Sequence, residues 1–409
     1  MGDQQRHVCV IGLGYIGLPT SAVLAAAGHR ITGVDVSQEV VDIINQGRIH
    51  IVEPDLEKHV SEAVQKGLLK AQTTPAKAEI FMICVPTPFV HGTGIPEPDM
   101  KYVVSATRAI APYVEAGNLV ILESTSPVGS TELVRDTLAS EGVDVNSIGF
   151  AYCPERVLPG QIMRELVEND RIVGGYTPEA AQAVAKFYRT FVSKGTVHTT
   201  NARTAEMSKL VENSFRDVSI AFANELSMIC ARHGINVREL IDLANRHPRV
   251  NILNPGAGVG GHCIAVDPWF VVAMDPNARL IKQAREVNDY KAEWTLERIE
   301  EAADAFKEAN GRPAKIAALG LAFKPNIDDL RESPALAITN KLIEKGYDVL
   351  PVEPNLHEHG ILKLVPLEDA LAKADILAFL VAHDQFFDLD VQGKVSLDFV
   401  GVRRYRFEG

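Results

Sequence analysis

Cysteine, basic charge and long apolar runs are all scarce in this chain of 409 residues. Its five cysteines are odd in number and widely spaced, which fits neither a disulfide framework nor a metal site and indicates a reducing compartment. Acidic residues outnumber basic ones by 53 to 41, whereas a nucleic-acid partner requires a basic surface. No uncharged apolar run approaches the roughly 20 residues of a membrane helix, and no signal-like segment opens the sequence. We therefore expect a cytoplasmic protein with no nucleic-acid, membrane or metal partner.

Strand-like and helix-like stretches alternate through the first 170 residues. The β-rich runs are 7–11, 30–34, 80–85, 119–124 and 148–152, and the helical stretches are 18–27, 40–46, 56–66, 100–113 and 130–140. Alternation returns near the C-terminus, with strand-like runs at 315–321, 348–352 and 376–381 and helical ones at 334–345 and 367–374. Both regions are therefore predicted to hold parallel sheets covered by helices.

Between these two regions the pattern is helical. One long helix is predicted from about Asn201 to His233, closed by Gly234 as a C-terminal cap residue. Further helices are predicted at 237–244 and, with some breaks, at 278–309. The long helix carries an apolar stripe at helical spacing, made of Met207, Leu210, Val211, Val218, Ala221, Phe222 and Ile229.

A glycine-rich segment joins the first predicted strand to the first predicted helix. Its glycines permit a tight turn, close approach of a pyrophosphate and tight helix packing, and the helix N-terminus offers free N–H groups. Asp35 ends the second strand, where a carboxylate binds a ribose 2′-hydroxyl and repels the 2′-phosphate of NADP. We predict an NAD site here; the alternative is a glycine turn followed by a helix-capping aspartate. The candidate residues are Gly12, Gly14, Tyr15, Ile16, Gly17 and Asp35.

Length and pattern together predict three domains, because 409 residues exceed one typical core. We expect an N-terminal Rossmann-like NAD-binding domain at residues 1–200 and a central all-helical domain, with the long helix, at 201–310. A C-terminal Rossmann-like α/β domain is expected at 311–409, after the linker-like Gly311-Arg312-Pro313.

Two further segments, 85–88 and 123–129, follow strands of the predicted parallel sheet. Ligands of open α/β sheets bind at the carboxyl ends of the strands, so Pro86, Thr87 and Thr125 are candidates for cofactor contacts. The alternative is that the prolines of these segments simply end the strands.

Glycines crowd Cys263 within residues 258–268, which lets a substrate carbon approach its sulfur, and Asp267 follows four residues later. Lone cysteines are usually inert core residues. We expect that state for the other four, which are Cys9, Cys84, Cys153 and Cys230.

Lys209 and Asn213 lie one turn apart on the long helix, on a face away from the apolar stripe. Such a pair is either a solvated helix face or part of a site.

Seven motifs, taken in order, resemble those of the UDP-glucose/GDP-mannose dehydrogenase family over essentially the whole chain. They are the glycine loop, Val85-Pro86-Thr87-Pro88, Ser124-Thr125, Cys153-Pro154-Glu155-Arg156, the Lys209 and Asn213 pair, residues 260–263 with Asp267, and Phe323-Lys324 with Arg331-Glu332-Ser333-Pro334. The resemblance implies two successive NAD-dependent oxidations of a sugar C6 alcohol to a carboxylate. It also implies a UDP-sugar substrate, bound partly by the C-terminal domain, and a homodimer formed through the long helix.

The resemblance implies roles for particular residues. Cys263 is the nucleophile that forms a thiohemiacetal and then a thioester. Lys209 and Asn213 stabilise the oxyanion, Asp267 and Glu155 activate water, and Thr125 positions a water or the reacting hydroxyl. Arg331 faces the cofactor or the domain junction, and Arg249 reaches the site of the neighbouring subunit. Substrate contacts are implied for Glu155, Arg156, Val157, Lys209, Asn213, Arg249, Asn251, Leu253, Gly260 and Lys324.

The sugar is indicated by departures from the UDP-glucose pattern. UDP-glucose enzymes usually carry an aromatic residue before the cysteine and Leu-Pro-Lys-Asp after it, where this chain has His262 and Ile264-Ala265-Val266-Asp267. Residues 153–160 and 262–270 are most similar to family members that oxidise UDP-N-acetyl-D-mannosamine; UDP-N-acetyl-D-glucosamine and UDP-glucose are the alternatives. A 3-hydroxyacid or 6-phosphogluconate type of dehydrogenase needs no catalytic cysteine, and a non-catalytic NAD-binding scaffold needs neither Cys263 nor Lys209.

Overall fold

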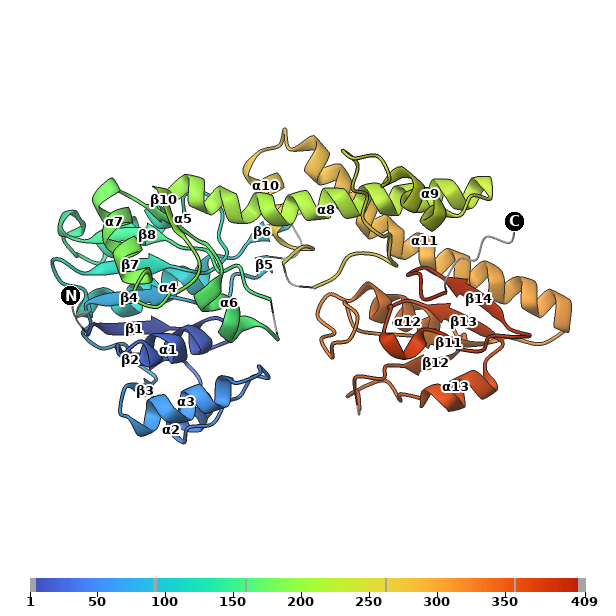
Figure 1. Cartoon of the computed structure of the whole chain (residues 1–409), viewed down its shortest axis with the longest axis horizontal. Helices are drawn as coiled ribbons and strands as arrows, with labels where there is room; N and C mark the ends of the chain where they lie inside the picture. Colours follow the sequence, from blue (N-terminus) through green and yellow to red (C-terminus); the bar gives the residue numbers. More distant parts are fainter. Residues whose placement is uncertain (1–4, 91–93, 159, 262, 357, 404–409) are drawn as a thin grey trace. The chain divides into compact units, whose positions relative to one another are not determined.

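The computed structural model describes residues 5–90, 94–158, 160–261, 263–356 and 358–403. The chain divides into two compact units, Met1–Val211 and Glu212–Gly409, and each has its own main sheet (Figure 1). Among the described residues, no helix is long and apolar enough to cross a bilayer.

The first unit is built on an eight-stranded sheet with the order β10-β9-β8-β7-β4-β1-β2-β3. Neighbouring strands run parallel except β8 and β9, which pair antiparallel. A separate two-stranded ribbon joins β5 (Phe89–Val90) to β6 (Glu97–Pro98). The strands of the main sheet are β1 (His7–Ile11), β2 (Arg30–Val34), β3 (Leu69–Gln72), β4 (Ile80–Ile83), β7 (Leu119–Leu122), β8 (Gly149–Tyr152), β9 (Arg171–Gly175) and β10 (Val197–Asn201).

Helices cover both faces of this sheet and bury an apolar cluster on each. One cluster packs against α1 (Gly17–Ala26), α2 (Gln38–Asn45), α3 (Leu56–Gln65), α6 (Ile162–Glu168) and α7 (Pro178–Tyr188). The other packs against α4 (Lys101–Ile110) and α5 (Ser130–Ser140). The nearly continuous apolar strands of the sheet interior are explained by this double coverage.

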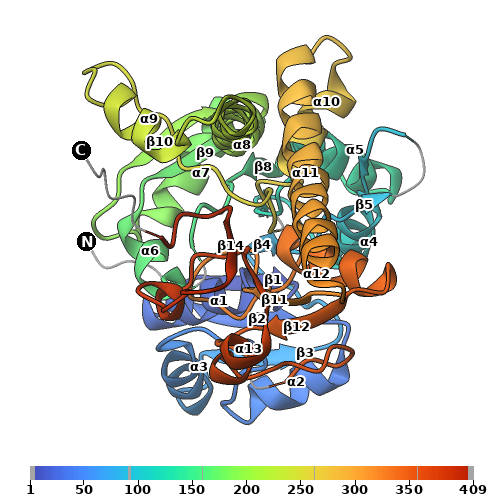
Figure 2. The same ribbon diagram turned by 90° about the vertical axis from the view of Figure 1, so that its right-hand side faces the viewer.

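The second unit combines helices with a four-stranded parallel sheet of order β12-β11-β13-β14 (Figure 2). One apolar cluster joins α11 and α12 to one face of the sheet, and a second cluster joins α13 to the other face. The elements are α9 (Val237–Ala244), α10 (Asp267–Met274), α11 (Arg279–Asn310), β11 (Lys315–Leu319), α12 (Pro334–Glu344), β12 (Asp348–Val352), α13 (Leu367–Lys373), β13 (Ile376–Phe379) and β14 (Val395–Asp398).

The predicted fold class is confirmed, with three local corrections. The alternation does not stop near residue 170, because β9, α7 and β10 extend the first sheet. The sheet is not purely parallel, since β8 meets β9 antiparallel. The helix predicted with breaks at 278–309 is continuous as α11, and α10 and β14 were not predicted at all. The domain limits at 200 and 310 stay a prediction.

Helix α8 (Ala202–His233) buries polar side chains and exposes apolar ones. Glu206, Asp217 and Asn224 are fully buried, whereas Phe215 and Phe222 are 73% and 56% exposed. The predicted apolar stripe is therefore divided, with Leu210 and Ala221 buried and Val211, Phe222 and Ile229 exposed.

Candidate functional site

The glycine loop between β1 and α1 has the geometry of a phosphate-binding turn. Gly12 has a positive φ of 92°, and a Cβ on it would lie 2.7 Å from the carbonyl oxygen of Cys84. A Cβ on Gly17 would lie 1.8 Å from the Gly12 carbonyl oxygen, so only glycine fits there. By contrast, a Cβ on Gly14 would meet nothing within 4 Å, which leaves open space beside the backbone. Tyr15 is exposed and Ile16 is the N-cap residue of α1.

Asp35 connects the glycine loop to the segment before α2. One carboxylate oxygen accepts the Leu13 N–H at 3.1 Å, and the other accepts the Ser37 N–H at 3.0 Å. Ser37, not Asp35, caps α2, because its hydroxyl accepts the Val40 N–H. The helix-capping alternative for Asp35 is therefore wrong, and the carboxylate is held at the carboxyl end of β2 beside the glycine loop.

The two strand-end segments meet beside this loop. Thr87 Oγ1 donates to the carbonyl oxygen of Thr125 at 2.6 Å, and Ser124 Oγ donates to that of Val85 at 2.7 Å. These bonds tie the residues after β4 to those after β7, and β4 also pairs with β1. The cofactor candidates Thr87 and Thr125 thus share one sheet edge with Gly12 and Asp35, while Pro86 lies exposed between them.

Glu155 lies in a buried ion pair. Its Oε2 accepts Arg171 Nη1 at 2.7 Å, and its Oε1 accepts the N–H of Arg156 at 2.6 Å. Arg171 and Glu155 are 1% and 7% exposed. Val157 packs partly buried against the apolar cluster of α1. The neighbouring Pro159 lies outside the described residues.

A second buried carboxylate, Glu123, lies near this pair. Tyr188 donates its hydroxyl to one Glu123 oxygen, and Cys84 Sγ lies 3.4 Å from the other. Burial, together with the negative charge of Glu155, raises the pKa of Glu123 to about 7. One buried cation, Arg171, therefore serves two buried carboxylates, and the second keeps its proton near neutral pH.

The five cysteines, all among the described residues, differ in exposure. Cys9, Cys153 and Cys230 are buried, Cys84 is partly buried and Cys263 is exposed. Burial raises the pKa of Cys153 to about 12 and that of Cys9 to about 11, and it also raises those of Cys84 and Cys230. Because the thiolate is the reactive form, the four less exposed thiols are poor nucleophiles.

Cys263 and Asp267 lie one turn apart where α10 begins. The carbonyl oxygen of Cys263 accepts the Asp267 N–H at 2.9 Å. Asn213 Nδ2, from α8, donates to Asp267 Oδ2 at 2.5 Å, and both side chains are buried. The structure therefore brings together three of the predicted catalytic residues of the second unit. His262, in the same motif, lies outside the described residues.

Lys209 belongs to the first unit, and it is 9% exposed. Asn213, one turn further along α8, is 8% exposed. The pair is therefore not a solvated helix face.

The loop before Cys263 is anchored by two asparagines that the sequence did not reveal. The side chain of Asn245 exchanges two hydrogen bonds with the backbone of Ile252, at 2.8 and 3.0 Å. Asn224 accepts the Gly256 N–H at 2.9 Å and donates to Asn288. The substrate candidates Arg249 and Asn251 are exposed on this loop, and Leu253 is partly buried.

Further along, the loop packs against the segment that follows β11. A Cβ on Gly260 would lie 2.4 Å from the carbonyl oxygen of Glu332, so the backbone approaches closely there. Gly261 donates its N–H to the carbonyl oxygen of Arg331 at 3.2 Å. The Arg331 guanidinium pairs with Asp329 at 2.6 Å, and Lys324 is exposed.

Two buried glutamates were also missed, and each caps a helix of the first unit. Glu206 accepts the backbone N–H groups of Gly129 and Thr131 at the start of α5. Glu53 accepts those of Gly160 and Ile162 at the start of α6. A carboxylate at a helix N-terminus is stabilised by the unpaired N–H groups there, but its distance in sequence hides it from a local pattern.

Three successive segments of the chain match the three domains of one protein family. They are the NAD binding domain of the UDP-glucose/GDP-mannose dehydrogenase family over residues 6–192, its central domain over 203–290 and its UDP binding domain over 317–402. The chain belongs to this family.

Individual members are similar over nearly their full length. The UDP-N-acetyl-D-mannosamine dehydrogenase of Escherichia coli K12 is 55% identical over 93% of this chain and 94% of its own. An NDP-N-acetyl-D-galactosaminuronic acid dehydrogenase of Ralstonia nicotianae is 53% identical over 97% and 96%. Among solved structures, the UDP-N-acetyl-mannosamine dehydrogenase Cap5O of Staphylococcus aureus has a TM-score of 0.88 and 40% identity over 98% of this chain and 96% of its own.

The raised pKa of Glu123 can be measured directly. We expect the infrared spectrum of the wild-type protein, minus that of Glu123→Gln, to contain the carbonyl band of a protonated carboxyl group at pH 5. Because the pKa of Glu123 is raised to about 7, this band should lose half its intensity near pH 7 rather than near pH 4. A band that is already absent at pH 6 would contradict the assignment.

Proposed function

We propose that this protein oxidises the C6 alcohol of a UDP-N-acetylhexosamine to the carboxylate, with two molecules of NAD⁺ consumed per sugar. The observation that carries the proposal is the exposed Cys263 beside a buried Asn213–Asp267 pair, in a family of nucleotide-sugar dehydrogenases. Cys263 is assigned as the nucleophile because it is the exposed cysteine, whereas burial makes the other four poorly reactive.

The cofactor is proposed to bind the sheet edge that carries Gly12, Gly14 and Asp35. Open space beside Gly14 suits a pyrophosphate at the start of α1. Asp35 suits a ribose 2′-hydroxyl and disfavours the 2′-phosphate of NADP. When bound, NAD⁺ supplies the hydride acceptor. Tyr15, Ile16, Gly17, Pro86, Thr87, Thr125 and Arg331 are proposed as further contacts.

The reaction is proposed to proceed in three stages. First, the C6 alcohol loses a hydride and a proton and becomes an aldehyde. Second, the Cys263 thiol loses its proton and adds as a thiolate to the aldehyde carbon, and the resulting thiohemiacetal oxyanion loses a second hydride to become a thioester. Third, water attacks the thioester, which releases the carboxylate and returns the thiol. One water enters, two hydrides leave, and the alcohol ends as an acid.

The polar residues are proposed to serve the charges that develop in these stages. Lys209 and Asn213 stabilise the alkoxide and the thiohemiacetal oxygen. Asp267, held by Asn213, is proposed to accept the proton of the attacking water. Thr125 is proposed to position a water or the reacting hydroxyl. Glu155 is also proposed to activate water, and its oxygens accept hydrogen bonds from Arg171 and the backbone.

UDP-N-acetyl-D-mannosamine is proposed as the sugar nucleotide, on the strength of the 55% identity to a dehydrogenase named for it. A second candidate is another 2-acetamido sugar, because the galactosaminuronic acid dehydrogenase is nearly as similar, at 53%. The substrate contacts are proposed to include Arg156, Val157, Arg249, Asn251, Leu253, Gly260 and Lys324.

A homodimer through α8 is proposed as the assembly, in the cytoplasm. Phe215, Phe222 and Ile229 are all exposed and follow one another at seven-residue intervals. Apolar residues at that spacing form the seam between paired helices. Three exposed large apolar side chains on one stripe are unusual for a helix that faces only water.

Replacing the proposed nucleophile should separate the two oxidations. We expect Cys263→Ser to lose essentially all acid production while it still binds NAD⁺, because an aldehyde cannot release its C–H hydrogen as hydride until a nucleophile has added to the carbonyl carbon. Mass spectrometry of the product and calorimetric titration with NAD⁺ measure both properties. Cys230→Ser is the matched control and should retain turnover. Near-wild-type acid formation by Cys263→Ser would exclude the thioester route.

The substrate assignment is tested by NADH yield. Purified protein is incubated with limiting UDP-N-acetyl-D-mannosamine, UDP-N-acetyl-D-glucosamine or UDP-glucose, and the NADH formed per sugar is measured by absorbance. We expect two NADH per UDP-N-acetyl-D-mannosamine and a markedly higher kcat/KM for it than for the others. A preference for UDP-glucose, or a yield of one NADH per sugar, would refute the proposal.

The assembly is tested by introducing a charge into the apolar stripe. Phe222→Asp should convert the dimer into monomers in sedimentation velocity, because a buried carboxylate without a partner is costly. Phe222→Leu keeps the stripe apolar and should remain dimeric. A wild-type protein that sediments as a monomer would rule out the assembly.

A further inference from the structure

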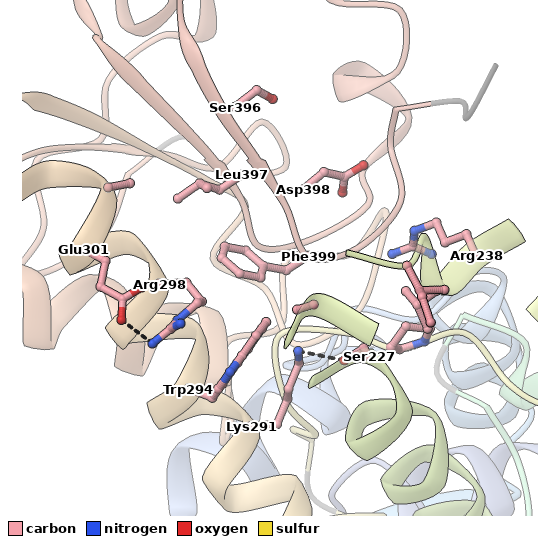
Figure 3. Close-up of a pocket in the computed structure, with 15 residues that line it drawn as sticks. Ser227, Arg238, Lys291, Trp294, Arg298, Glu301, Ser396, Leu397, Asp398 and Phe399 are labelled. Carbon is pink, nitrogen blue, oxygen red and sulfur yellow. Dashed lines mark hydrogen bonds and ion pairs between the residues drawn. The ribbon is translucent and has the colours of Figure 1, made fainter. Parts of the chain in front are cut away.

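Four polar residues that follow strands of the second sheet have no part in the site described above. Asn326 follows β11, Glu353 and Asn355 follow β12, and His383 follows β13, and together they form a strand-end cluster. Glu353 is 4% exposed and His383 is 0% exposed. No member of the cluster lines the cavity of about 510 Å³ that is lined by α11 and β14 (Figure 3). Substitutions in the cluster therefore leave the lining of that cavity unchanged.

The hydrogen bonds of His383 fix the place of its ring proton. Its Nδ1 accepts the Asn326 N–H at 2.9 Å, so this nitrogen carries no proton. The proton therefore lies on Nε2, which donates to Glu353 Oε2 at 3.0 Å. The ring thus joins the segment after β11 to the segment after β12.

Glu353 is surrounded by hydrogen-bond donors. Besides His383, its Oε2 accepts the N–H groups of Leu321 and Ala322 at 2.8 and 3.0 Å, and its Oε1 accepts the Asn355 N–H at 3.1 Å. Burial opposes ionisation, but the hydrogen bonds from His383 and the backbone hold the pKa of Glu353 below its usual value. The carboxylate therefore fixes the first residues after β11 as an anion.

The segment after β11, residues 321–333, is strained at two places. Asn326 and Glu332 have φ values of 61° and 50°, in the left-handed region that residues other than glycine seldom adopt. They are two of the four such residues in the described part of the chain. Asn326 is held on both sides, because its N–H bonds to His383 and its Oδ1 accepts the Asp384 N–H at 2.9 Å. Strain of this kind persists only where the surrounding structure imposes it, and it is concentrated at functional sites.

The other end of the 321–333 segment supports the loop that carries Cys263. A Cβ on Gly260 would lie 2.4 Å from the carbonyl oxygen of Glu332, and one on Gly261 would lie 2.7 Å from the Phe323 ring. Glycine at both positions therefore lets the loop pack closely against the segment. Cys263 follows Gly261 by two residues. The backbone just before the proposed nucleophile thus rests on the 321–333 segment.

We propose that Glu353 and His383 are positioning residues for the proposed nucleophile, because they hold the 321–333 segment in the strained conformation against which the Cys263 loop packs. This inference rests on the proposed function. The two ends of the segment are tied together, since Ser333 Oγ donates to the carbonyl oxygen of Leu321 at 2.6 Å. Misplacing a reacting atom by about 1 Å costs on the order of 100-fold in rate, even when the cause lies far from it.

The proposed reaction makes this role distinguishable from support of the fold. Cys263 acts only in the second oxidation, because the first removes a hydride from the alcohol without a thiol adduct. Loss of the positioning should therefore slow the second hydride transfer and spare the first. A residue that only stabilised the fold would affect both hydride transfers alike.

Two substitutions of His383 separate its two hydrogen bonds. In His383→Asn, the side-chain oxygen takes the place of Nδ1 and can still accept the Asn326 N–H. In His383→Gln, the amide reaches the place of Nε2 and can donate to Glu353, but nothing replaces Nδ1. Both variants remove the same buried ring, so they are matched in the packing that they lose.

Stopped-flow absorbance measures NADH with the full-length protein in excess over UDP-N-acetyl-D-mannosamine and with saturating NAD⁺. Wild-type protein should form two NADH per sugar in successive phases. We expect His383→Gln to slow the second phase roughly 10- to 100-fold while the first keeps its rate. His383→Asn should retain most of the second-phase rate. Circular dichroism verifies the fold of each variant.

A second pair of variants covers the case in which the buried position tolerates no change. Asn326→Ala and Asp388→Ala both place alanine at an exposed position with a positive φ, of 61° and 63°. Their backbone strain is therefore similar, but only Asn326 belongs to the strand-end cluster. We expect Asn326→Ala to slow the second phase and Asp388→Ala to leave both phases unchanged.

Hydrogen exchange measures the same coupling without turnover. Gly261 donates its N–H to the carbonyl oxygen of Arg331 at 3.2 Å, so loosening the segment exposes this amide. We expect the peptide that contains Gly261 to exchange faster in His383→Gln and Asn326→Ala than in wild-type protein. His383→Asn and Asp388→Ala should exchange as the wild type does.

Equal slowing of the two NADH phases, or an unchanged second phase in folded His383→Gln and Asn326→Ala, would overturn the inference and leave the proposed function standing. Equal losses in His383→Gln and His383→Asn would overturn it as well. Absence of NADH from wild-type protein with every UDP-sugar would instead refute the proposed function. In that case, faster exchange at Gly261 would still support the coupling between the strand-end cluster and the Cys263 loop, and unchanged exchange would exclude it.

Discussion

The burial of polar side chains along helix α8 is the constraint on which much of this structure depends. A buried polar group without a partner costs about 1–3 kcal/mol, so each one must be matched by a specific neighbour. Glu206 is matched by the first N–H groups of α5, Asn213 by Asp267, and Asp217 by Arg285 and Asn288. Asn224 holds the backbone of the loop that leads to Cys263. Helix α8 thereby positions the start of α5, the carboxylate of Asp267 and the loop that leads to Cys263.

This constraint could not be predicted from the sequence of the helix alone. A helical pattern locates the helix and its ends, because caps and periodicity are local. Helix α9 was predicted with the bounds that the structure has, Val237–Ala244. The same pattern shows an apolar stripe at helical spacing, which an ordinary surface helix would turn toward the core. Which face is buried depends on partners far along the chain, such as Arg285, which lies 68 residues from Asp217. Those partners determine that the polar face is covered.

The residues of the candidate site also fall into two groups: some are determined by nearby sequence, and others by partners that are distant in the sequence. The glycine loop and Asp35 were predictable because the turn, the strand end and the carboxylate lie within about two dozen residues and each has a single physical reason. The Glu155–Arg171 pair was not, since nothing in the motif around Glu155 states that a buried guanidinium faces it. The role of Glu53 was also unpredictable, because this residue lies 107 positions from Gly160, whose N–H it accepts.

Cys153 and Cys263 show why motif membership does not by itself identify a reactive group. Both lie in family motifs beside a carboxylate, yet burial raises the pKa of Cys153 to about 12 while Cys263 is exposed. A cysteine nucleophile needs an accessible sulfur on a backbone that is held in a fixed position. Asn224 and Asn245 meet the second need by hydrogen bonds to the loop backbone, at positions upstream of the cysteine. The proposed nucleophile therefore lies at the end of a loop whose backbone is held upstream of it.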